Sequence, residues 1–479
     1  MKLRQWQAEC IQLALKKYMN GASHFLALAT PGAGKTVMAS ELADQLLKND
    51  RIDLVICFAP SSMVARDFGA SLHARTQYQF DGKLGAKGHS LTYQSLQYLD
   101  DSFWQLFKRF RVFVIFDEIH HCAGSNIENA NAWGEKIILN IQNKAEFTLA
   151  LTGTPWRSDA APIVLSNYTT PYNKISCDYV YGLADALRDD VCRVPQIVAI
   201  DNDKISVADD EYTHHFNSFK ALLSQSIIPY QEVIQHEDVM RYLLLTSNKK
   251  LRKIRKINPN AAGLIVASSV EHARSISQLM KRYFDEHATL VTYQESEPTR
   301  IIEQFREDST SWIISVGMIS EGTNIPRLQV CCHLTNIKTE MHFRQILGRI
   351  LRVTGSKNQE AVMYMPAEPK LLEYAYRVNQ DVPAEAGVVK FEKMAVTERE
   401  KNKGSAAVIN FDKGSANIEQ IKDKPSLIVA EFCGTSIKYT GKESAYEKEE
   451  HFLTQCYQKS VNIFGKFKQE AIALSLSEL

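Results

Sequence analysis

The stretch ATPGAGKT, residues 29–36, decides the fold of this chain. It follows the apolar run HFLAL (24–28), which predicts a short buried strand, and it leads into KTVMASELADQLL (35–47), whose apolar residues recur at helical spacing. A glycine-rich turn between a strand and a helix directs backbone N–H groups, together with the positive end of the helix dipole, towards one point. The stretch therefore predicts a site for a nucleoside triphosphate in an α/β fold.

The residue types of this loop match the needs of a triphosphate one by one. Lys35 would reach the β- and γ-phosphates, and the hydroxyl of Thr36 would bind Mg²⁺. The match to the pattern GxxxxGK[ST] is imperfect, because Ala29 rather than glycine opens it. The alternative is a plain glycine turn between a strand and a helix. The residues that we expect to surround the phosphates are Pro31, Gly32, Ala33 and Gly34.

The composition is that of an ordinary globular protein. The chain has 479 residues, of which 45% are hydrophobic and 23% charged, and its formal net charge is +1. This length allows about three domains of ~100–200 residues. The charge does not mark a nucleic-acid binder, although a locally basic groove would still bind phosphates. No apolar run approaches the ~20 residues of a membrane span, and the first ten residues lack the apolar stretch of a secretory signal, so we expect a cytoplasmic protein with no membrane contact.

The nine cysteines are scattered, and none forms a CxxC pair. This spacing disfavours a zinc ribbon and a disulfide framework, so we expect buried thiols in a reducing compartment. His120, His121 and Cys122 form a cluster, but no fourth metal ligand follows at a suitable spacing. A polar role beside the nucleotide is the interpretation that we favour for this cluster.

RVFVIFDEIHH, residues 111–121, predicts a second buried strand that ends in two carboxylates. Its residues 112–116 are all apolar, as expected of a central parallel strand. Asp117, at the carboxyl end, would hold Mg²⁺ directly or through water, and Glu118 would orient and deprotonate an attacking water. The alternative is a buried strand that ends in solvated acids.

In chain order, ATPGAGKT, DEIH (117–120) and LTGTP (151–155) resemble motifs I, II and III in the first motor domain of a superfamily 2 helicase. The last of these would couple the carboxylate strand to a neighbouring surface, although alone it is also an ordinary turn. LRQWQAECIQLAL (3–15) resembles the leading Q-containing motif, which implies that Gln7 contacts the nucleotide base.

Further segments extend the resemblance along the chain. FAPSSMVARDF (58–68) and LTYQSL (91–96) resemble motifs Ia and Ib, which implies contacts with nucleic-acid phosphates. GLIVASSVEHARSISQLM (263–280) resembles motif IV, at the start of the second motor domain. YVYGLADALRDDVCRVPQIV (179–198) is similar to the connector in the branch that includes the helicase subunits of restriction enzymes.

SWIISVGMISEGTNIPRL, residues 311–328, resembles motif V, with Gly322 at its turn. The family usually has x-Gly-x-Asp-x-Pro here, and that Asp contacts the ribose or helps to coordinate the cleft. This chain has Asn324 in the Asp position. The resemblance implies that Gly322 and Asn324 lie at the nucleotide, and the change leaves the nucleotide preference and the strength of coupling open.

HFRQILGRILR, residues 342–352, resembles motif VI. Gln345, Arg349 and Arg352 follow one another at spacings of four and three, so one helical face would present all three. Arginines that face a triphosphate across a domain cleft stabilise transition-state charge, which is worth roughly 10³–10⁵ in rate in related NTPases. The alternative is a surface helix with one or two ion pairs.

The fold class that these elements predict is α/β, with two RecA-like P-loop domains in tandem, a helical insertion and a small C-terminal extension. The predicted boundaries are 1–165 for the first RecA-like domain, 166–245 for a connector and helical insertion, 246–385 for the second RecA-like domain, and 386–479 for the C-terminal extension. Residues 397–417 have the composition of a linker. The tail then shows the strand-like SLIVAEF (426–432) and a helical pattern from Glu443 onward, and it is a candidate docking module for a protein partner.

The basic run KKLRKIRK, residues 249–256, predicts an amphipathic helix. Leu251, Ile254 and Ile257 would form its apolar face. Two interpretations stay open for the basic face: a solvated surface, or a surface that contacts phosphates.

The resemblance implies an enzyme that uses ATP and Mg²⁺ to move along nucleic acid, with DNA favoured over RNA, and a place in bacterial antiphage defence. Two alternatives remain. One is a translocase that moves on duplex DNA without separating the strands. The other is an ATP-controlled interaction subunit whose cleft signals to a protein partner through the tail.

Overall fold

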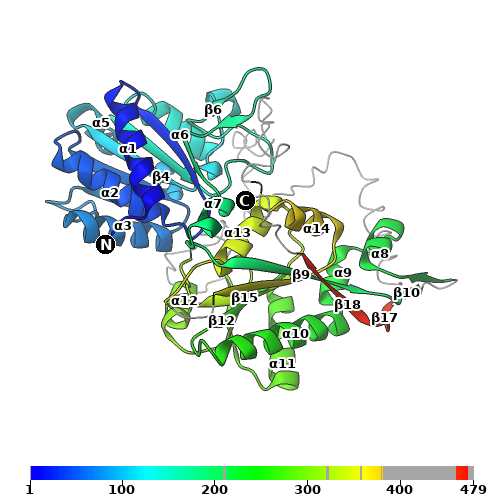
Figure 1. The fold of residues 1–479 in the computed structure, drawn as a ribbon. Coiled ribbons are helices and arrows are strands. Elements are labelled where there is room, and N and C mark those ends of the chain that lie inside the picture. Colours follow the sequence, from blue (N-terminus) through cyan, green and yellow to red (C-terminus); the bar gives the residue numbers. More distant parts are fainter. Residues whose placement is uncertain are drawn as a thin grey trace, which may run out of the picture.

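The computed structural model contains two α/β domains, the first coloured blue to cyan and the second green to yellow in Figure 1. The structure describes residues 2–208, 212–319, 323–355, 359–378, 380 and 460–472. Each domain is built on a sheet whose main strands are parallel. The predicted α/β fold class, with two tandem P-loop-type domains, is confirmed.

The first domain is a parallel sheet with helices on both faces. Its strands are β1 (His24–Ala29), β2 (Leu54–Ala59), β3 (Gly88–Thr92), β4 (Val112–Asp117), β5 (Phe147–Thr152) and β8 (Tyr179–Tyr181). Its helices are α1 (Gln5–Met19), α2 (Lys35–Lys48), α3 (Ser62–Thr76), α4 (Asp101–Trp104), α5 (Leu106–Arg109) and α6 (Ala132–Asn140), with 3-10 turns at Tyr93–Gln97, Ile119–His121 and Ile127–Asn129. The strand order is β3-β2-β4-β5-β1-β8. In β4, Phe113 and Ile115 join the core that α1 and α2 cover, whereas Val114 and Phe116 join the core on the α6 side, which explains the unbroken apolar run.

The segment between the domains was predicted to be a connector and helical insertion at 166–245, but it also contains strands. It contains β6 (Asn167–Tyr168), β7 (Ile175–Ser176), α7 (Leu183–Arg188), β9 (Val194–Asn202), β10 (Ile205–Ala208), β11 (Thr213–Phe216), α8 (Phe219–Gln225), α9 (Tyr230–Gln235) and the start of α10 (Glu237–Arg255). β8 pairs with β1 in the first sheet, and β9 pairs with β16 (Glu360–Pro366) in the second. The connector therefore contributes a strand to each of the two sheets.

The second domain carries a seven-stranded sheet in the order β13-β14-β12-β15-β16-β9-β18. Its further strands are β12 (Ala262–Ala267), β13 (Ala288–Val291), β14 (Trp312–Ser315), β15 (Leu328–Leu334) and β18 (Phe467–Ile472). Its helices are α10, α11 (Val270–Phe284), α12 (Pro298–Glu307), α13 (Glu340–Ile350) and α14 (Pro369–Tyr376). All strand pairs of this sheet are parallel except β9 with β18. No helix in the described part of the chain is long and apolar enough to cross a membrane.

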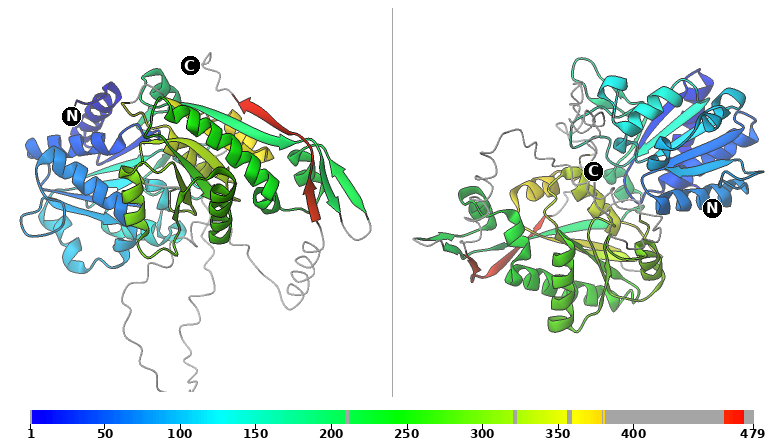
Figure 2. Two further views of the ribbon diagram at one scale, coloured as in Figure 1. Left: turned by 90° about the horizontal axis from the view of Figure 1, so that it is seen from below. Right: turned by 180° about the vertical axis from the view of Figure 1, so that it is seen from behind.

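The described part of the tail corrects one expectation. A helical pattern was predicted from Glu443 onward, but residues 460–472 form two strands. β17 (Ser460–Ile463) pairs with β10, and β18 pairs with β9, so the red strands of Figure 2 run along the edge of the second domain. The predicted linker at 397–417 and the strand-like 426–432 lie outside the described residues.

The basic run at 249–256 lies mostly within α10, as predicted. Leu251 and Ile254 are fully buried, but Ile257 lies beyond the helix and is 59% exposed. Of the basic side chains, Lys250 pairs with Glu360 and Arg252 pairs with Glu286 (both within the second domain). These pairs favour the solvated surface over the phosphate-contacting one.

Candidate active site

Three neighbouring strands of the first sheet end on one side of it. β1 leads into the loop at 30–34, β4 ends at Asp117, and β5 is followed closely by Gly153. Because β4, β5 and β1 are adjacent and parallel, their carboxyl ends bring the loop, the two carboxylates and the turn together. This is the usual position of a ligand site in an open α/β sheet.

The loop at 30–34 has the backbone of a phosphate cradle. Gly32 and Gly34 have φ angles of +86° and +96°, a left-handed conformation that glycine adopts without a steric penalty. Gly34 directly precedes α2 and has no side chain to cap the helix, so the first N–H groups of α2 face the loop. A Cβ on Gly34 would lie 2.8 Å from Nε2 of Gln7. The loop therefore needs glycine at this position, and its shape fits a triphosphate.

Lys35 and the carboxylates after β4 form the charged centre of this half of the site. Nζ of Lys35 lies 3.1 Å from Oε1 of Glu118 and donates a 3.1 Å hydrogen bond to the carbonyl of Ala29. Oε2 of Glu118 accepts a 3.2 Å hydrogen bond from the N–H of Gly153. Glu118 has a φ of +51°, a conformation that costs on the order of 1–3 kcal/mol and is concentrated at functional sites. Asp117 is 7% exposed.

His120 has a polar role beside this centre. Its Nδ1 lies 2.9 Å from Oγ1 of Thr152 and 3.4 Å from Oε2 of Glu118. Its backbone carbonyl accepts a 2.7 Å hydrogen bond from Nη1 of Arg157. Among the described residues, no three His, Cys, Asp or Glu side chains are arranged to hold a metal ion. The metal-binding alternative for residues 120–122 therefore finds no support.

The second domain contributes two arginines that converge on one carbonyl. Nη1 of Arg349 and Nη1 of Arg352 donate to the carbonyl of Thr323 at 2.8 and 2.9 Å. Nη1 of Arg352 also donates to the side-chain oxygen of Asn324 at 2.6 Å. Burial and, after it, the charges of Arg349 and Arg306 lower the pKa of Arg352 to about 9. A cluster of cations this crowded suits a polyanionic ligand.

The predicted helical face of Gln345, Arg349 and Arg352 is wrong in one respect. α13 ends before Arg352, which instead forms an isolated β-bridge with Cys192. Strand-like pairing with the connector, and not helical periodicity, therefore places this arginine. Gln345 lies on α13 and is 7% exposed. Gly322, which was also expected at the nucleotide, lies outside the described residues.

The two halves of the site touch at the phosphate loop itself. A Cβ on Gly348 of α13 would lie 2.5 Å from Cβ of Pro31, so glycine lets the helix pack against the loop. A Cβ on Gly32 would lie 3.1 Å from Cγ of Arg352. Sγ of Cys192 lies 3.7 Å from the carbonyl oxygen of Pro31. Gly348 and Arg352 of one domain thus lie against the phosphate loop of the other.

The start of the chain holds the other end of the loop. Gln7 is 3% exposed, and its Nε2 donates a 3.0 Å hydrogen bond to the carbonyl of Gly34. Nη1 of Arg4 donates to the carbonyl of Ala33 at 2.6 Å. Sequence reasoning missed Arg4 and Cys192. Arg4 could have been found from its place one turn before Gln7, whereas nothing local marks Cys192.

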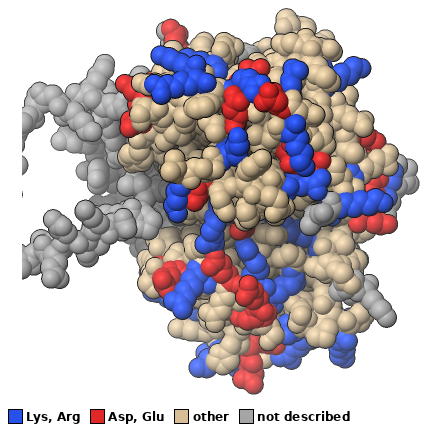
Figure 3. Space-filling view, turned by 90° about the vertical axis from the view of Figure 1, so that its left-hand side faces the viewer, with Lys and Arg blue, Asp and Glu red and all other residues tan. Residues whose placement is uncertain are grey.

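A second contact between the domains joins α3 and α12. Arg66 of α3 pairs with Glu303 of α12, and Nη2 of Arg306 lies 3.5 Å from Oδ2 of Asp67. Partly exposed pairs of this kind contribute roughly 0–1 kcal/mol each. Figure 3 shows the molecule from the left-hand side of Figure 1, where Lys and Arg are interspersed with Asp and Glu on both domains. This face carries mixed charge, in keeping with the net charge of the chain.

Two protein-family models match the chain, one for each half of the site. Residues 1–157 match the model of the type III restriction enzyme res subunit. Residues 246–354 match the model of the helicase conserved C-terminal domain. The first match covers the loop and the carboxylates, and the second covers the two arginines.

Curated relatives match over most of this chain. An uncharacterized protein of Mycobacterium tuberculosis is 28% identical over 394 residues, which are 78% of this chain and 62% of that protein. An uncharacterized protein of Mycobacterium leprae is 29% identical over 394 residues, which are 78% of this chain and 63% of that protein. The match spans about three fifths of the length of these relatives.

Solved structures share the fold at low sequence identity. A fragment assigned as an HsdR subunit of a type I restriction enzyme from Vibrio vulnificus has a TM-score of 0.54 at 16% identity, with 79% of this chain and 67% of that chain covered. The type ISP restriction-modification enzyme LlaBIII bound to DNA has a TM-score of 0.51 at 14% identity, with 81% and 30% covered. The two family models therefore make this chain similar to the superfamily 2 helicases of the restriction-enzyme res branch, and the solved structures share its two-domain fold.

Proposed function

We propose that this chain is an ATP-driven motor that moves along nucleic acid and prefers DNA to RNA. The observation that carries the proposal is the contact between the phosphate loop and the other domain, at Pro31 with Gly348 and at Gly32 with Arg352. A triphosphate in this loop would lie between the domains, so binding, hydrolysis and release would each change the contact. The preference for DNA rests on the match to the type III restriction enzyme res subunit model and on LlaBIII, a solved structure of similar fold that is bound to DNA.

The residues of the first domain suit ATP with Mg²⁺. The loop and Lys35 offer N–H groups and a charge to the phosphates. Thr36 at the start of α2 and Asp117 at the end of β4 offer oxygen atoms, which are the ligands that Mg²⁺ prefers. Mg²⁺ would supply charge neutralisation at the β- and γ-phosphates. Gln7, tied to the loop, is the residue that we place at the nucleotide base.

Glu118 is the residue that we assign to the attacking water. It is 3.1 Å from Lys35 in the structure, and phosphate oxygens would compete for that lysine. Glu118 would then accept a proton from water, a contribution of about 10²–10⁴ in rate. Arg349 and Arg352 would exchange their shared carbonyl for the charge that develops on the transferred phosphoryl group, for roughly 10³–10⁵ in rate.

Cycles of closing and opening would move a strand that both domains grip. Contacts with backbone phosphates carry no sequence information, so such a grip needs no recognition motif. One alternative is a translocase on duplex DNA that leaves the strands paired. The other is an ATP-controlled subunit that signals to a protein partner. Because β18 pairs with β9 in the sheet of the second domain and β17 pairs with β10 in a separate three-stranded sheet, a partner that docked on these strands would contact the motor domain directly.

The deciding experiment measures ATP turnover with single-stranded DNA, duplex DNA, forked DNA and RNA at one fixed low salt concentration. We expect stimulation by DNA above RNA in the wild-type chain, and loss of turnover in Lys35→Ala. An ATP turnover rate that is the same with and without each nucleic acid would contradict the proposed motor function. Strand-displacement and triplex-displacement assays side by side separate a helicase from a duplex translocase.

A role in bacterial antiphage defence is the finer part of the proposal, and it rests on the match to the type III restriction enzyme res subunit model. Phage plating efficiency on cells that express the wild-type chain or Lys35→Ala tests it. We expect the wild-type chain to lower plating and the variant to leave it unchanged. Equal plating on both strains would remove the defence role without touching the motor.

A further inference from the structure

Arg193 lies in the connector, directly before β9. It is a buried arginine whose five N–H donors are all engaged in hydrogen bonds. It is 1% exposed. Nε donates to Oε1 of Gln359 (3.2 Å), Nη1 to the carbonyls of Leu328 (2.6 Å) and Ile350 (3.1 Å), and Nη2 to the carbonyl of Pro326 (3.3 Å) and to Oγ1 of Thr354 (3.2 Å). None of these acceptors, all within the described residues, is a carboxylate.

Stability alone gives no reason for a cation at this position. The removal of a charge from water costs several kcal/mol per ion even after the surroundings relax, and burial lowers the pKa of Arg193 to about 10. An apolar side chain of similar size is often as stabilising as a buried ion pair, or more so. The reason for a cation at this position must therefore lie in the segments that its five hydrogen bonds hold in place.

The acceptors lie in the segments that place the arginines of the site. Both arginines of the site contact the carbonyl of Thr323. Pro326 lies three residues after Thr323. Ile350 directly follows Arg349 at the end of α13. The carbonyls at a helix C-terminus lack intrahelical partners and carry partial negative charge, which a cation stabilises. Arg193 thus joins the end of α13 to the segment between Thr323 and β15.

The connector also reaches the phosphate loop at this point. The N–H of Arg193 donates a 2.7 Å hydrogen bond to the carbonyl of Leu351. The preceding residue, Cys192, forms a β-bridge with Arg352, and its Sγ lies 3.7 Å from the carbonyl oxygen of Pro31. The chain therefore runs between the phosphate loop and the arginines, and Arg193 anchors it on the arginine side.

We propose that Arg193 is a positioning residue, which keeps Arg349 and Arg352 in register with the phosphate loop without touching the nucleotide. The inference rests on the proposed ATP hydrolysis and deepens it. A displacement of about 1 Å at catalytic groups costs up to ~10² in rate. Without the clamp, the end of α13 shifts, while the first domain still binds the nucleotide. The effect falls on kcat, and the Kd for ADP stays near its wild-type value.

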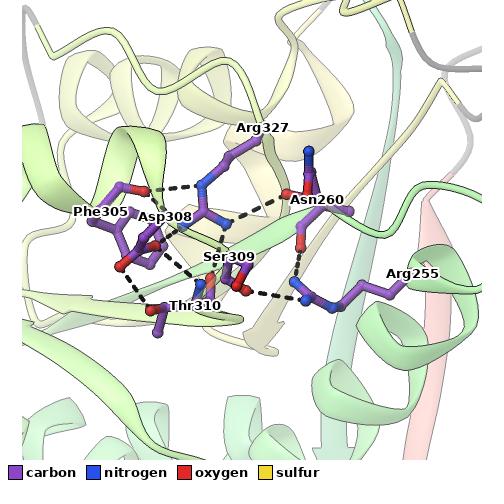
Figure 4. A network of polar contacts seen from close by, with 8 residues as sticks. Arg255, Asn260, Phe305, Asp308, Ser309, Thr310 and Arg327 are labelled. Carbon is purple, nitrogen blue, oxygen red and sulfur yellow. Dashed lines mark hydrogen bonds and ion pairs between the residues drawn. The ribbon is translucent and has the colours of Figure 1, made fainter.

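Arg327 offers a matched control in the same domain (Figure 4). It is 8% exposed, and burial lowers its pKa to about 10 as well. It donates to the carbonyls of Phe305 (2.6 and 3.0 Å), Thr310 (2.8 Å) and Asn260 (3.4 Å), and it pairs with Asp308 at 2.8 Å. None of these partners belongs to α13 or to the phosphate loop. The side chain of Arg327 therefore contacts neither α13 nor the phosphate loop, although its backbone lies in the segment that Arg193 also holds.

The test compares Arg193→Met and Arg327→Met in the full chain. The measurements are kcat and KM for ATP, the Tm, and the Kd values for ADP and for a non-hydrolysable ATP analogue. We expect both variants to lose stability. Only Arg193→Met loses ~10² in kcat with the Kd for ADP within about threefold, and only Arg193→Met loses the preference for the ATP analogue over ADP, since the γ-phosphate is what the two arginines would contact.

Thr354→Val removes a single acceptor of the clamp and serves if Arg193→Met does not fold. We expect a fall in kcat of roughly three- to tenfold, as for one lost hydrogen bond. Wild-type kcat in the folded Arg193→Met or Thr354→Val variant, or an equal loss in Arg327→Met, overturns the inference. If the wild-type chain hydrolyses no ATP, the proposed function fails, and the analogue-over-ADP preference of the variants still decides whether Arg193 positions the arginines.

Discussion

The two halves of the site are built in different ways. In the first domain the loop, the lysine and the carboxylates stand at the carboxyl ends of adjacent parallel strands, within short continuous segments. In the second domain Thr323 comes from one segment and Arg349 and Arg352 from another, and the described contacts that join the two segments are long-range hydrogen bonds. Arg193 and Gly348 complete this second half from the connector and from α13.

This difference separates binding from turnover. The first half is a cradle whose shape follows from local backbone conformation at Gly32 and Gly34. The second half meets that cradle only where the domains touch, so it holds its position through interdomain packing. Variants in the first half should affect nucleotide binding or the water, whereas variants in the second half should lower kcat and leave binding in place.

The largest expected effect comes from the second half. Arg349→Ala removes a cation that shares the carbonyl of Thr323 with Arg352. Turnover should fall by roughly 10³-fold or more, because a finger of this kind acts mainly on the transition state. ADP affinity, measured by titration, should stay within about threefold of wild type. A comparable loss of ADP affinity would show that the two halves are not separable.

Glu118→Gln tests how the first half activates the attacking water, as distinct from how it binds the phosphates. The amide keeps the size of the side chain but cannot accept the proton, so kcat should fall by about 10²–10⁴. Because Glu118 also pairs with Lys35 at 3.1 Å, its loss frees the lysine, and ATP should bind as tightly as in wild type or more tightly. Single-turnover kinetics with a binding titration check both. Weaker ATP binding would contradict the competition between Glu118 and phosphate for Lys35.

Gly348→Val probes the contact between the halves. A Cβ at this position would lie 2.5 Å from Cβ of Pro31, so a branched side chain must push α13 away from the loop. We expect kcat to fall by up to ~10², with an increase in the radius of gyration by small-angle scattering as the domains separate. Gly355→Ala is the control, because no atom lies within 4 Å of a Cβ there. Wild-type turnover in Gly348→Val would mean that the domains need not touch at this point.

The sequence predicts the first half well, since its information is local. The strand before the loop, the helix after it and the strand that ends at Asp117 all follow from apolar runs and periodicity over about ten residues. The structure has them as β1, α2 and β4. Met38, Leu42 and Leu46 of α2 are buried, which agrees with the helical spacing of apolar residues predicted for 35–47.

The second half and the tail were harder, because their positions depend on pairing between distant segments. A helical period extended through 342–352 placed Arg352 on α13, but the chain leaves the helix and pairs with Cys192. β9 pairs with β18, more than 250 residues later, and no local pattern reports such a partner. The helical pattern predicted from Glu443 gives way to strands at 460–472 for the same reason: tertiary pairing overrides local propensity.

Each domain contains a buried histidine that makes it sensitive to acid. Burial, and next the charge of His342, lower the pKa of His333 in β15 to about 3, and neither ring nitrogen of His333 has a hydrogen-bond partner within the described residues. In the first domain, burial lowers the pKa of His24 to about 4, but its Nδ1 lies 2.8 Å from Oγ1 of Thr148. Both histidines must stay neutral in the folded chain.

The stability that neutral His333 confers is complete above the ordinary histidine pKa of about 6.5 and falls as the pH decreases towards the folded value, because the unfolded chain binds the proton first. Between pH 7 and pH 5 this amounts to on the order of 2 kcal/mol. Calorimetry at several pH values should show both domains losing stability over this interval, because His24 contributes nearly the same amount, and His333→Leu should flatten the dependence of the second domain. His214→Leu, at an exposed position on β11, should leave it unchanged. An unaltered pH dependence in His333→Leu would place the acid sensitivity elsewhere.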